Sequence, residues 1–124
     1  MTIKEFIKKY DLSATCQATD DDADLLSPGH VRHKVKVRGW FKGKFKSPYQ
    51  FNPDYNEFDL ESFLDCIQSD CRIGENGFGN MLKEFGDDGD VHRQRKIWKA
   101  CRKSYRKMKK FLGFAYEEFM TCEP

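Results

Sequence analysis

The sequence predicts a single-domain α+β fold: an N-terminal helix, a small antiparallel sheet of two or three strands, and a helical C-terminal half around one long basic amphipathic helix. The length of 124 residues is typical of one domain, residues 1–124. Apolar and basic residues alternate over Val31–Arg38, which indicates a half-buried strand. Apolar residues recur three and four positions apart over Asp90–Leu112, which indicates a long helix.

The N-terminal segment predicts a short helix over Thr2–Leu12. Thr2 and Glu5 have the spacing of a capping box, in which each residue satisfies a backbone N–H at the helix start. Ser13–Thr19 follows as a predicted strand, because small residues alternate along it.

The clearest β segment extends from His30 to Lys46, and a second strand is predicted around Phe41–Phe51. Together they predict an antiparallel hairpin that packs one face on a core and turns a basic face outward. The outward face carries Arg32, Lys34, Lys36, Arg38, Lys42, Lys44 and Lys46.

Three helices are predicted in the C-terminal half. Asp59 is the expected N-cap of a helix that reaches about Asp70, and Gly74 and Gly77 are expected to break the chain. A short helix follows over Phe78–Phe85 and ends at Gly86. The long helix has Asp90 as N-cap and ends at Gly113, and a last amphipathic turn contains Phe114, Tyr116, Phe119 and Met120.

The predicted core combines the apolar faces of these elements. It contains Phe6, Val35, Val37, Phe63, Leu64, Ile67, Leu82, Phe85, Trp98, Cys101, Tyr105 and Met108.

Charge is segregated along the chain. No acidic residue lies between Val91 and Leu112, whereas Asp54–Asp90 holds eleven acidic residues against Arg72 and Lys83. The basic segments predict either a phosphate-binding surface, with aromatic residues such as Trp40, Phe41, Trp98 and Tyr105 nearby, or internal pairing with the acidic helices, in which each exposed pair contributes little.

No catalytic motif is present, so the sequence predicts a protein that is not an enzyme and has no cofactor. Asp87–Asp90 fits helix capping better than a calcium loop. The five cysteines are an odd number and predict reduced thiols. Cys66, Cys71 and His92 lack the spacing of a zinc site, so no metal is expected. The N-terminus resembles no signal peptide and no apolar run has spanning length, which predicts a soluble cytosolic protein without a membrane partner.

Three segments resemble a group of small phage and prophage proteins: DLESFLDCIQSD (59–70), EFGDDGDVHRQRKIWKAC (84–101) and KMKKFLG (107–113). The resemblance implies a counter-defence protein, of the anti-CRISPR type, that acts in the cytoplasm of an infected bacterial host. Such a protein would bind and inhibit a host complex that handles nucleic acid, most plausibly a CRISPR-Cas effector. The alternative is a free-standing DNA- or RNA-binding accessory protein that uses the basic hairpin and helix.

The basic hairpin face is the predicted partner-binding surface, because a strand holds its cations at a fixed spacing of about 7 Å. Arg102, Arg106 and Lys109 of the long helix are expected to supplement it. The alternative is an acidic surface formed by Asp54, Glu57, Glu61 and Asp65.

Overall fold

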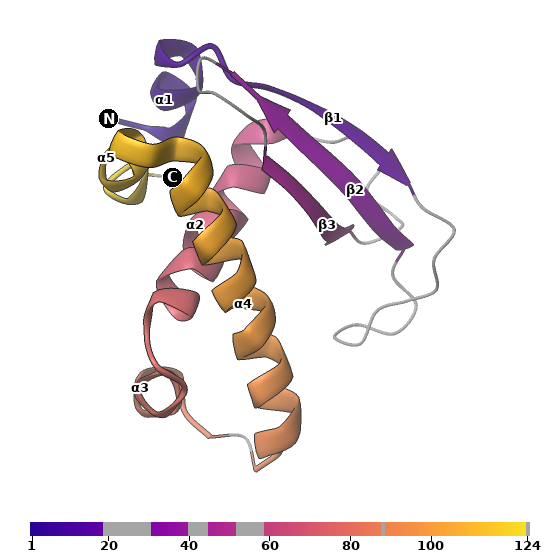
Figure 1. Cartoon of the computed structure of the whole chain (residues 1–124), viewed down its shortest axis with the longest axis vertical. Helices are drawn as coiled ribbons and strands as arrows, with labels where there is room; N and C mark the ends of the chain where they lie inside the picture. The colour runs from indigo at the N-terminus through magenta and orange to yellow at the C-terminus, as the bar shows by residue number, and fades with distance from the viewer. Residues whose placement is uncertain (19–30, 40–44, 52–58, 88, 124) are drawn as a thin grey trace.

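The computed structural model describes residues 1–18, 31–39, 45–51, 59–87 and 89–123, and it has the predicted α+β architecture (Figure 1). The N-terminal helix, the small antiparallel sheet and the long C-terminal helix are all present. Its elements are α1 (Ile3–Lys9), β1 (Ser13–Ala18), β2 (Val31–Arg38), β3 (Phe45–Phe51), α2 (Leu60–Glu75), α3 (Phe78–Phe85), α4 (Val91–Leu112), the 3-10 helix η1 (Gly113–Ala115) and α5 (Tyr116–Met120).

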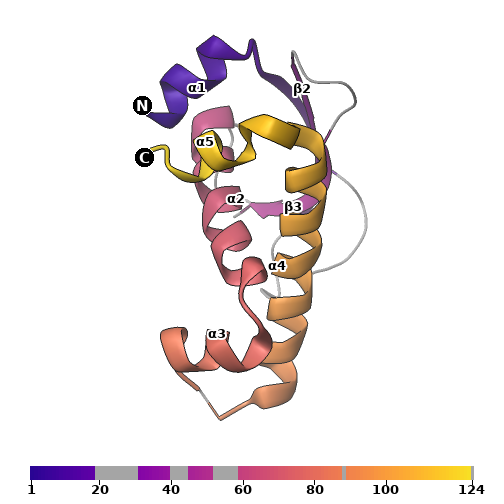
Figure 2. The ribbon, with the colours of Figure 1, turned by 60° about the vertical axis from the view of Figure 1, so that its left-hand side comes forward.

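The predicted capping box starts α1. The Thr2 hydroxyl accepts from the backbone N–H of Glu5, and the Glu5 carboxylate accepts from the N–H of Thr2, both at 3.1 Å. The two chain ends lie together (Figure 2), because the N–H of Ile3 donates to the carbonyl of Glu123 at 3.0 Å. A salt bridge of 2.7 Å between Lys9 and Glu118 also joins α1 to α5.

The sheet has three antiparallel strands in the order β1–β2–β3, so the predicted strand after α1 is confirmed. Val37 pairs with Ala14 on one side and Phe45 on the other, and its side chain is completely buried in the helical core. The sheet is therefore anchored to the helices at the C-terminal end of β2. Residues 41–44 of the predicted second strand lie outside the described residues.

Helices α2 and α4 run side by side in opposite directions (Figures 1 and 2). Asp59 caps α2 as predicted, but the expected break at Gly74 is wrong, because α2 continues to Glu75. Gly74 is buried where the helices touch, and a Cβ atom there would lie 2.3 Å from the carbonyl oxygen of Cys101. The missing side chain permits this close helix contact, so glycine serves packing here rather than chain termination.

Local signals fix the remaining helix ends as predicted. Gly86 ends α3 with a φ of 85°, and its N–H donates to the carbonyl of Leu82 at 2.9 Å. The Asp90 carboxylate accepts from the N–H of Arg93 at 3.0 Å and caps α4. Gly113 ends α4 with a φ of 56°, a conformation that suits a residue without a side chain.

The core lies where α1, α2, the C-terminal half of α4, α5 and Val37 meet. Cys101 and Met108 are buried as predicted, at 6% and 1% exposure. Three predicted core residues are only half-buried, namely Leu82, Trp98 and Tyr105, since they lie at the margin of the helix packing. Phe114 was predicted on the apolar side of the last amphipathic turn, but it faces outward with 74% exposure. The side chains of Val35 and Phe85 lie outside the described residues.

Candidate functional site

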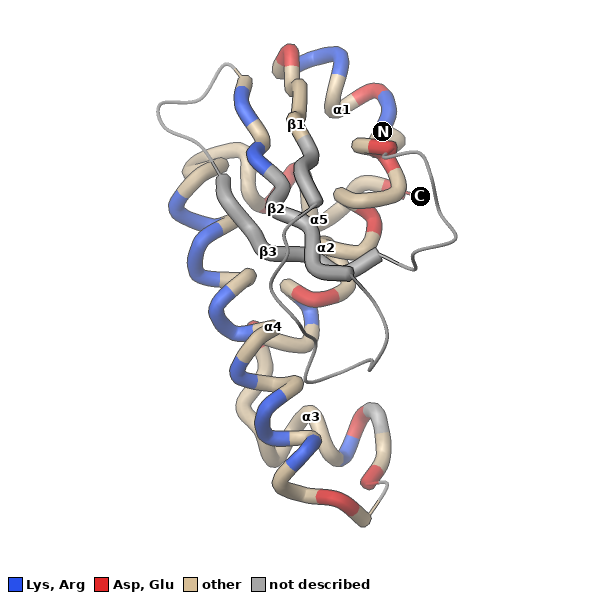
Figure 3. Tube along the Cα trace, turned by 90° about the vertical axis from the view of Figure 1, so that its right-hand side faces the viewer, with Lys and Arg blue, Asp and Glu red and all other residues tan. Residues whose placement is uncertain are grey.

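The outward side of α4 carries one straight line of basic side chains, here called the outer stripe. Its members follow each other at intervals of three and four residues, so they share one side of the helix. At a rise of 1.5 Å per residue the stripe extends over about 27 Å. Its six residues are all exposed: His92, Lys96, Lys99, Lys103, Arg106 and Lys110. Figure 3 shows Lys and Arg along this side of α4.

The outer stripe has no internal counter-charge in the described part of the chain. None of its six side chains makes a hydrogen bond or a salt bridge there, and no described carboxylate of α2 pairs with a cation of α4. The pKa of Asp70 on α2 is consistent with the lack of ion pairs between the two helices. Burial raises that pKa from 3.8 to about 6. A nearby cation would lower that pKa instead. The two helices therefore touch without neutralising each other.

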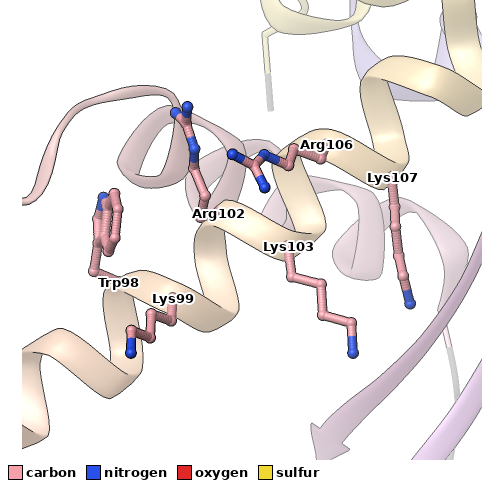
Figure 4. A pocket seen from close by; sticks show the side chains of 6 residues that line it. All are labelled: Trp98, Lys99, Arg102, Lys103, Arg106 and Lys107. Atoms are coloured by element: carbon pink, nitrogen blue, oxygen red, sulfur yellow. The ribbon is translucent and has the colours of Figure 1, made fainter.

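The middle of α4 borders a hollow of about 440 Å³ (Figure 4). Lys99, Lys103 and Lys107 point to the same side of the helix, four residues apart. That spacing sets successive ammonium groups about 6 Å apart along the axis. All the described lining residues come from α4: Trp98, Lys99, Arg102, Lys103, Arg106 and Lys107.

Lys107 lies in a partly desolvated position beside another cation at this hollow. The pKa of Lys107 lies below its usual value, first because its ammonium group is partly desolvated and second because Lys103 is close. A cation placed next to another cation is stabilised by an anion that approaches both. The row of lysines thus has the electrostatic character of an anion-binding surface.

Two side chains of α4 point away from this row and bind the C-terminal end of α2 (Figure 4). The Trp98 indole N–H donates to the carbonyl of Asn76 at 2.8 Å, and the Arg102 guanidinium donates to the carbonyl of Gly74 at 2.8 Å. Carbonyls at a helix C-terminus lack partners within the helix and carry partial negative charge. Trp98 and Arg102 therefore cap α2 from the side.

The aromatic rings along α4 are covered by neighbours. Phe78 packs against Trp98 with ring centroids 6.0 Å apart, and the Arg95 guanidinium lies 4.7 Å from the Phe78 ring. Tyr105 packs edge-on against Tyr116 at 5.9 Å, and Lys109 lies 5.6 Å from the Tyr105 ring. Aromatic residues here serve packing and cation–π contacts.

The structure separates the predicted strand surface from the cations of α4. The strand register places positions 32, 34, 36, 38 and 46 on one face of the sheet. Val37 points into the core that contains Met108 of α4, so its neighbours Lys36 and Arg38 belong to the opposite face. Lys36 is half-buried and Arg38 is exposed. The predicted strand surface is thus separate from α4, and Lys36 and Arg38 are its members with described side chains.

The other predicted partner-binding residues differ in their surroundings. Arg106 and Lys109 are exposed on α4, while Arg102 is half-buried and bound to α2. Glu61 and Asp65 are half-buried on α2. Four predicted residues lie outside the described residues, namely Lys42, Lys44, Asp54 and Glu57. For three more only the backbone is described, namely Arg32, Lys34 and Lys46.

Four lysines of the outer stripe are not among the predicted partner-binding residues, namely Lys96, Lys99, Lys103 and Lys110. The three-and-four spacing from His92 to Lys110 carries the signal that identifies them as one line. Their isolation from carboxylates requires the tertiary structure.

The thiols do not form a metal centre in the described residues, where no group of three or more His, Cys, Asp and Glu side chains is arranged around an ion. Cys66 is exposed, whereas Cys71 and Cys101 are buried between α2 and α4. Burial raises the pKa of both buried thiols to about 12, and the Asp70 carboxylate adds to the effect. Both are therefore protonated and unreactive near neutral pH.

Within the described ranges, no helix combines the length and apolarity needed to cross a membrane. The fold and the surface together define a small helix-rich α+β protein whose outer stripe has no carboxylate partner among the described residues. No protein-family model matches the chain, and neither a curated protein nor a solved structure shows significant similarity to it.

Proposed function

We propose that this protein is a non-enzymatic binding protein that holds the phosphate backbone of a nucleic acid on the outer stripe of α4. The observation that carries the proposal is the stripe itself: six exposed basic side chains in line over about 27 Å, without a carboxylate partner in the described residues.

A polyanion suits this surface better than a single acidic side chain. Lysines four residues apart on α4 offer charges about 6 Å apart, which a chain of phosphates can neutralise in succession. Each neutralised phosphate releases condensed counterions, and this release supplies most of the free energy of non-specific binding. The five Lys and Arg residues of the stripe predict a slope of log Kobs against log salt of about −4 to −5.

The first experiment measures binding of a fluorescent mixed-sequence DNA by anisotropy at several salt concentrations. The K99E/K103E/R106E variant is expected to lose at least about 100-fold in affinity at low salt, because reversal replaces three attractions with three repulsions. Its matched control is K4E/K8E/K83E, which reverses three exposed cations on α1 and α3 and should bind more nearly like the wild type.

Thermal unfolding of both variants shows whether each remains folded, and little change is expected at exposed positions. Equal loss of affinity in both variants would show that overall charge, and not the outer stripe, causes binding. Absence of any salt-dependent binding by the wild type would reject the proposal.

A counter-defence inhibitor of a CRISPR-Cas effector remains the second candidate, and it would act in the cytoplasm of an infected bacterium. Its specific support is that Glu61 and Asp65 of α2 have no cation partner on α4, so an acidic surface is available to imitate phosphates. Expression in bacteria that carry an active CRISPR-Cas system would then restore plasmid transformation. The E61K/D65K variant should abolish that effect, while K99E/K103E/R106E should preserve it.

A further inference from the structure

We infer that the nucleic acid held by the outer stripe is double-stranded B-form DNA, with α4 lying in its major groove; this inference rests on the function proposed above. An α-helix with its side chains is about 10–12 Å across, and the major groove of B-DNA is about 12 Å wide. The groove therefore accepts a helix that presents exposed cations along its outward side, as α4 does with the outer stripe.

Exposed cations project from α4 in more than one direction, so they can contact more than one strand of phosphates. At about 100° per residue, Lys107 and Lys109 project to opposite sides of the outer stripe and lie about 160° apart around the axis. Both are exposed. A helix in a groove has a phosphate strand on each side, so flanking cations on both sides match a duplex. A single strand that followed the stripe would leave one flank unused.

The rings beside α4 argue against a single strand. Proteins that bind single strands without sequence preference stack successive bases on free aromatic faces. In the described structure, the Phe78 ring is covered by Arg95 and Trp98, and the Tyr105 ring by Lys109 and Tyr116. The Trp98 indole is also fixed by its hydrogen bond to Asn76. No row of free rings is available along the described part of α4.

The side chains of the outer stripe also limit sequence recognition. Lysine and arginine bind phosphates and the O6 and N7 atoms of guanine, whereas asparagine and glutamine recognise adenine. Gln94 is the amide side chain of α4, but it is buried and its amide donates to the carbonyl of Gly86 at 3.1 Å. The bound duplex is thus held with little sequence preference beyond guanine.

The experiment compares four labelled probes of one sequence by anisotropy: a 20-base-pair DNA duplex, one of its single strands, the matching RNA duplex, and a DNA duplex whose thymines carry a bulky C5 substituent. The C5 position of thymine lies in the major groove, and the major groove of A-form RNA is too narrow and deep for side chains to enter. The plain DNA duplex should bind at least about tenfold more tightly than each of the other three.

Two single variants test the flanks. Lys107→Ala and Lys109→Ala should each reduce the salt slope for the DNA duplex by about 0.9, the value for one lost phosphate contact. Thermal unfolding of each variant separates this effect from a loss of folding.

The outcomes distinguish the two proposals. Equal or tighter binding of the single strand or RNA, or no effect of the C5 substituent, overturns the major-groove inference while backbone binding stands. A salt slope that changes for only one flank variant also overturns it. If none of the four probes binds, the proposed function itself fails.

Discussion

Helices α2 and α4 are neighbours of opposite charge, and they differ in how far their charged side chains are exposed. Both are amphipathic, and each buries its apolar side against the other, with Ile67 and Met108 among the fully enclosed side chains. The carboxylates of α2 are partly buried in several places, as at Asp70, whereas the cations of the outer stripe are all exposed. The acidic side chains of α2 thus lie partly against the rest of the fold, whereas the basic side chains of the outer stripe form part of the surface.

The comparison shows that complementary charge along a sequence is not pairing in space. The helices meet through apolar side chains and the Gly74–Cys101 contact, and the exposed cations of the outer stripe project away from the interface. Pairs at the rim of such an interface stabilise a fold by at most about 1 kcal/mol. The cations of the outer stripe consequently remain available to an external partner.

The largest expected effect comes from the close contact of α2 and α4 at Gly74. Gly74→Ala places a Cβ atom 2.3 Å from the carbonyl oxygen of Cys101, so the helix backbones must separate. Overpacking of this kind costs about 3 kcal/mol or more when backbone must move. Urea denaturation measures the change. Gly79→Ala on α3 is the control, since nothing lies within 4 Å of its added Cβ, and it should be neutral or slightly stabilising.

The two sides of α4 should respond differently to truncation. Met108 is 1% exposed, and Met108→Ala should lower the free energy of unfolding by about 3 kcal/mol because it leaves a cavity. Lys103→Ala on the exposed side should change it by less than about 0.5 kcal/mol. Chemical denaturation of both variants tests this contrast. A large loss for Lys103→Ala would show that the outer stripe is part of the folded interior.

The pH dependence of stability tests whether Asp70 lacks an ion pair with α4. Its pKa rises from 3.8 in the unfolded chain to about 6 in the folded protein because burial disfavours the charged form. The folded state thus binds this proton more tightly, and stability falls as pH rises from about 4 to about 6. Asp70→Asn should raise the free energy of unfolding at pH 7 by about 2 kcal/mol, since two pKa units correspond to nearly 3 kcal/mol before solvent screening.

NMR titration of the Asp70 carboxyl measures that pKa directly. A value below 3.8 would mean that a cation reaches Asp70 and that the two helices do neutralise each other. Glu75→Gln at the exposed end of α2 is the control, and its effect on stability should stay within about 0.5 kcal/mol.

The smallest expected effect is on stability, at Trp98, which caps α2 and does not belong to the outer stripe. Trp98→Phe removes the donor to the Asn76 carbonyl and should cost about 1 kcal/mol of stability. Because the indole is used inside the molecule, affinity for DNA should change less than twofold. Unfolding curves and anisotropy give the two values. A variant that is fully stable but binds DNA weakly would instead assign Trp98 to the ligand.

Local signals made most of the secondary structure predictable. The Thr2–Glu5 capping box, the Asp59 and Asp90 caps and the glycines after α3 and α4 each act within about four residues. Periodicity likewise identified Cys101 and Met108 as buried. The prediction failed at Gly74, because a glycine that permits a helix contact has the same sequence signature as one that ends a helix.

The sequence by itself determined the helices, the strands and the charge on each, since helix caps and hydrophobic periods depend on neighbours along the chain. It also showed that the long helix is basic throughout, with no acidic residue between Val91 and Leu112. Only the tertiary structure decided which basic side chains remain without a partner, because that depends on contacts between residues distant in sequence. Arg102 and Lys103 are adjacent, yet Arg102 binds the end of α2 and Lys103 faces outward. A helix turns by about 100° per residue, so adjacent side chains point in different directions. Arg102 therefore reaches α2, whereas Lys103 stays exposed.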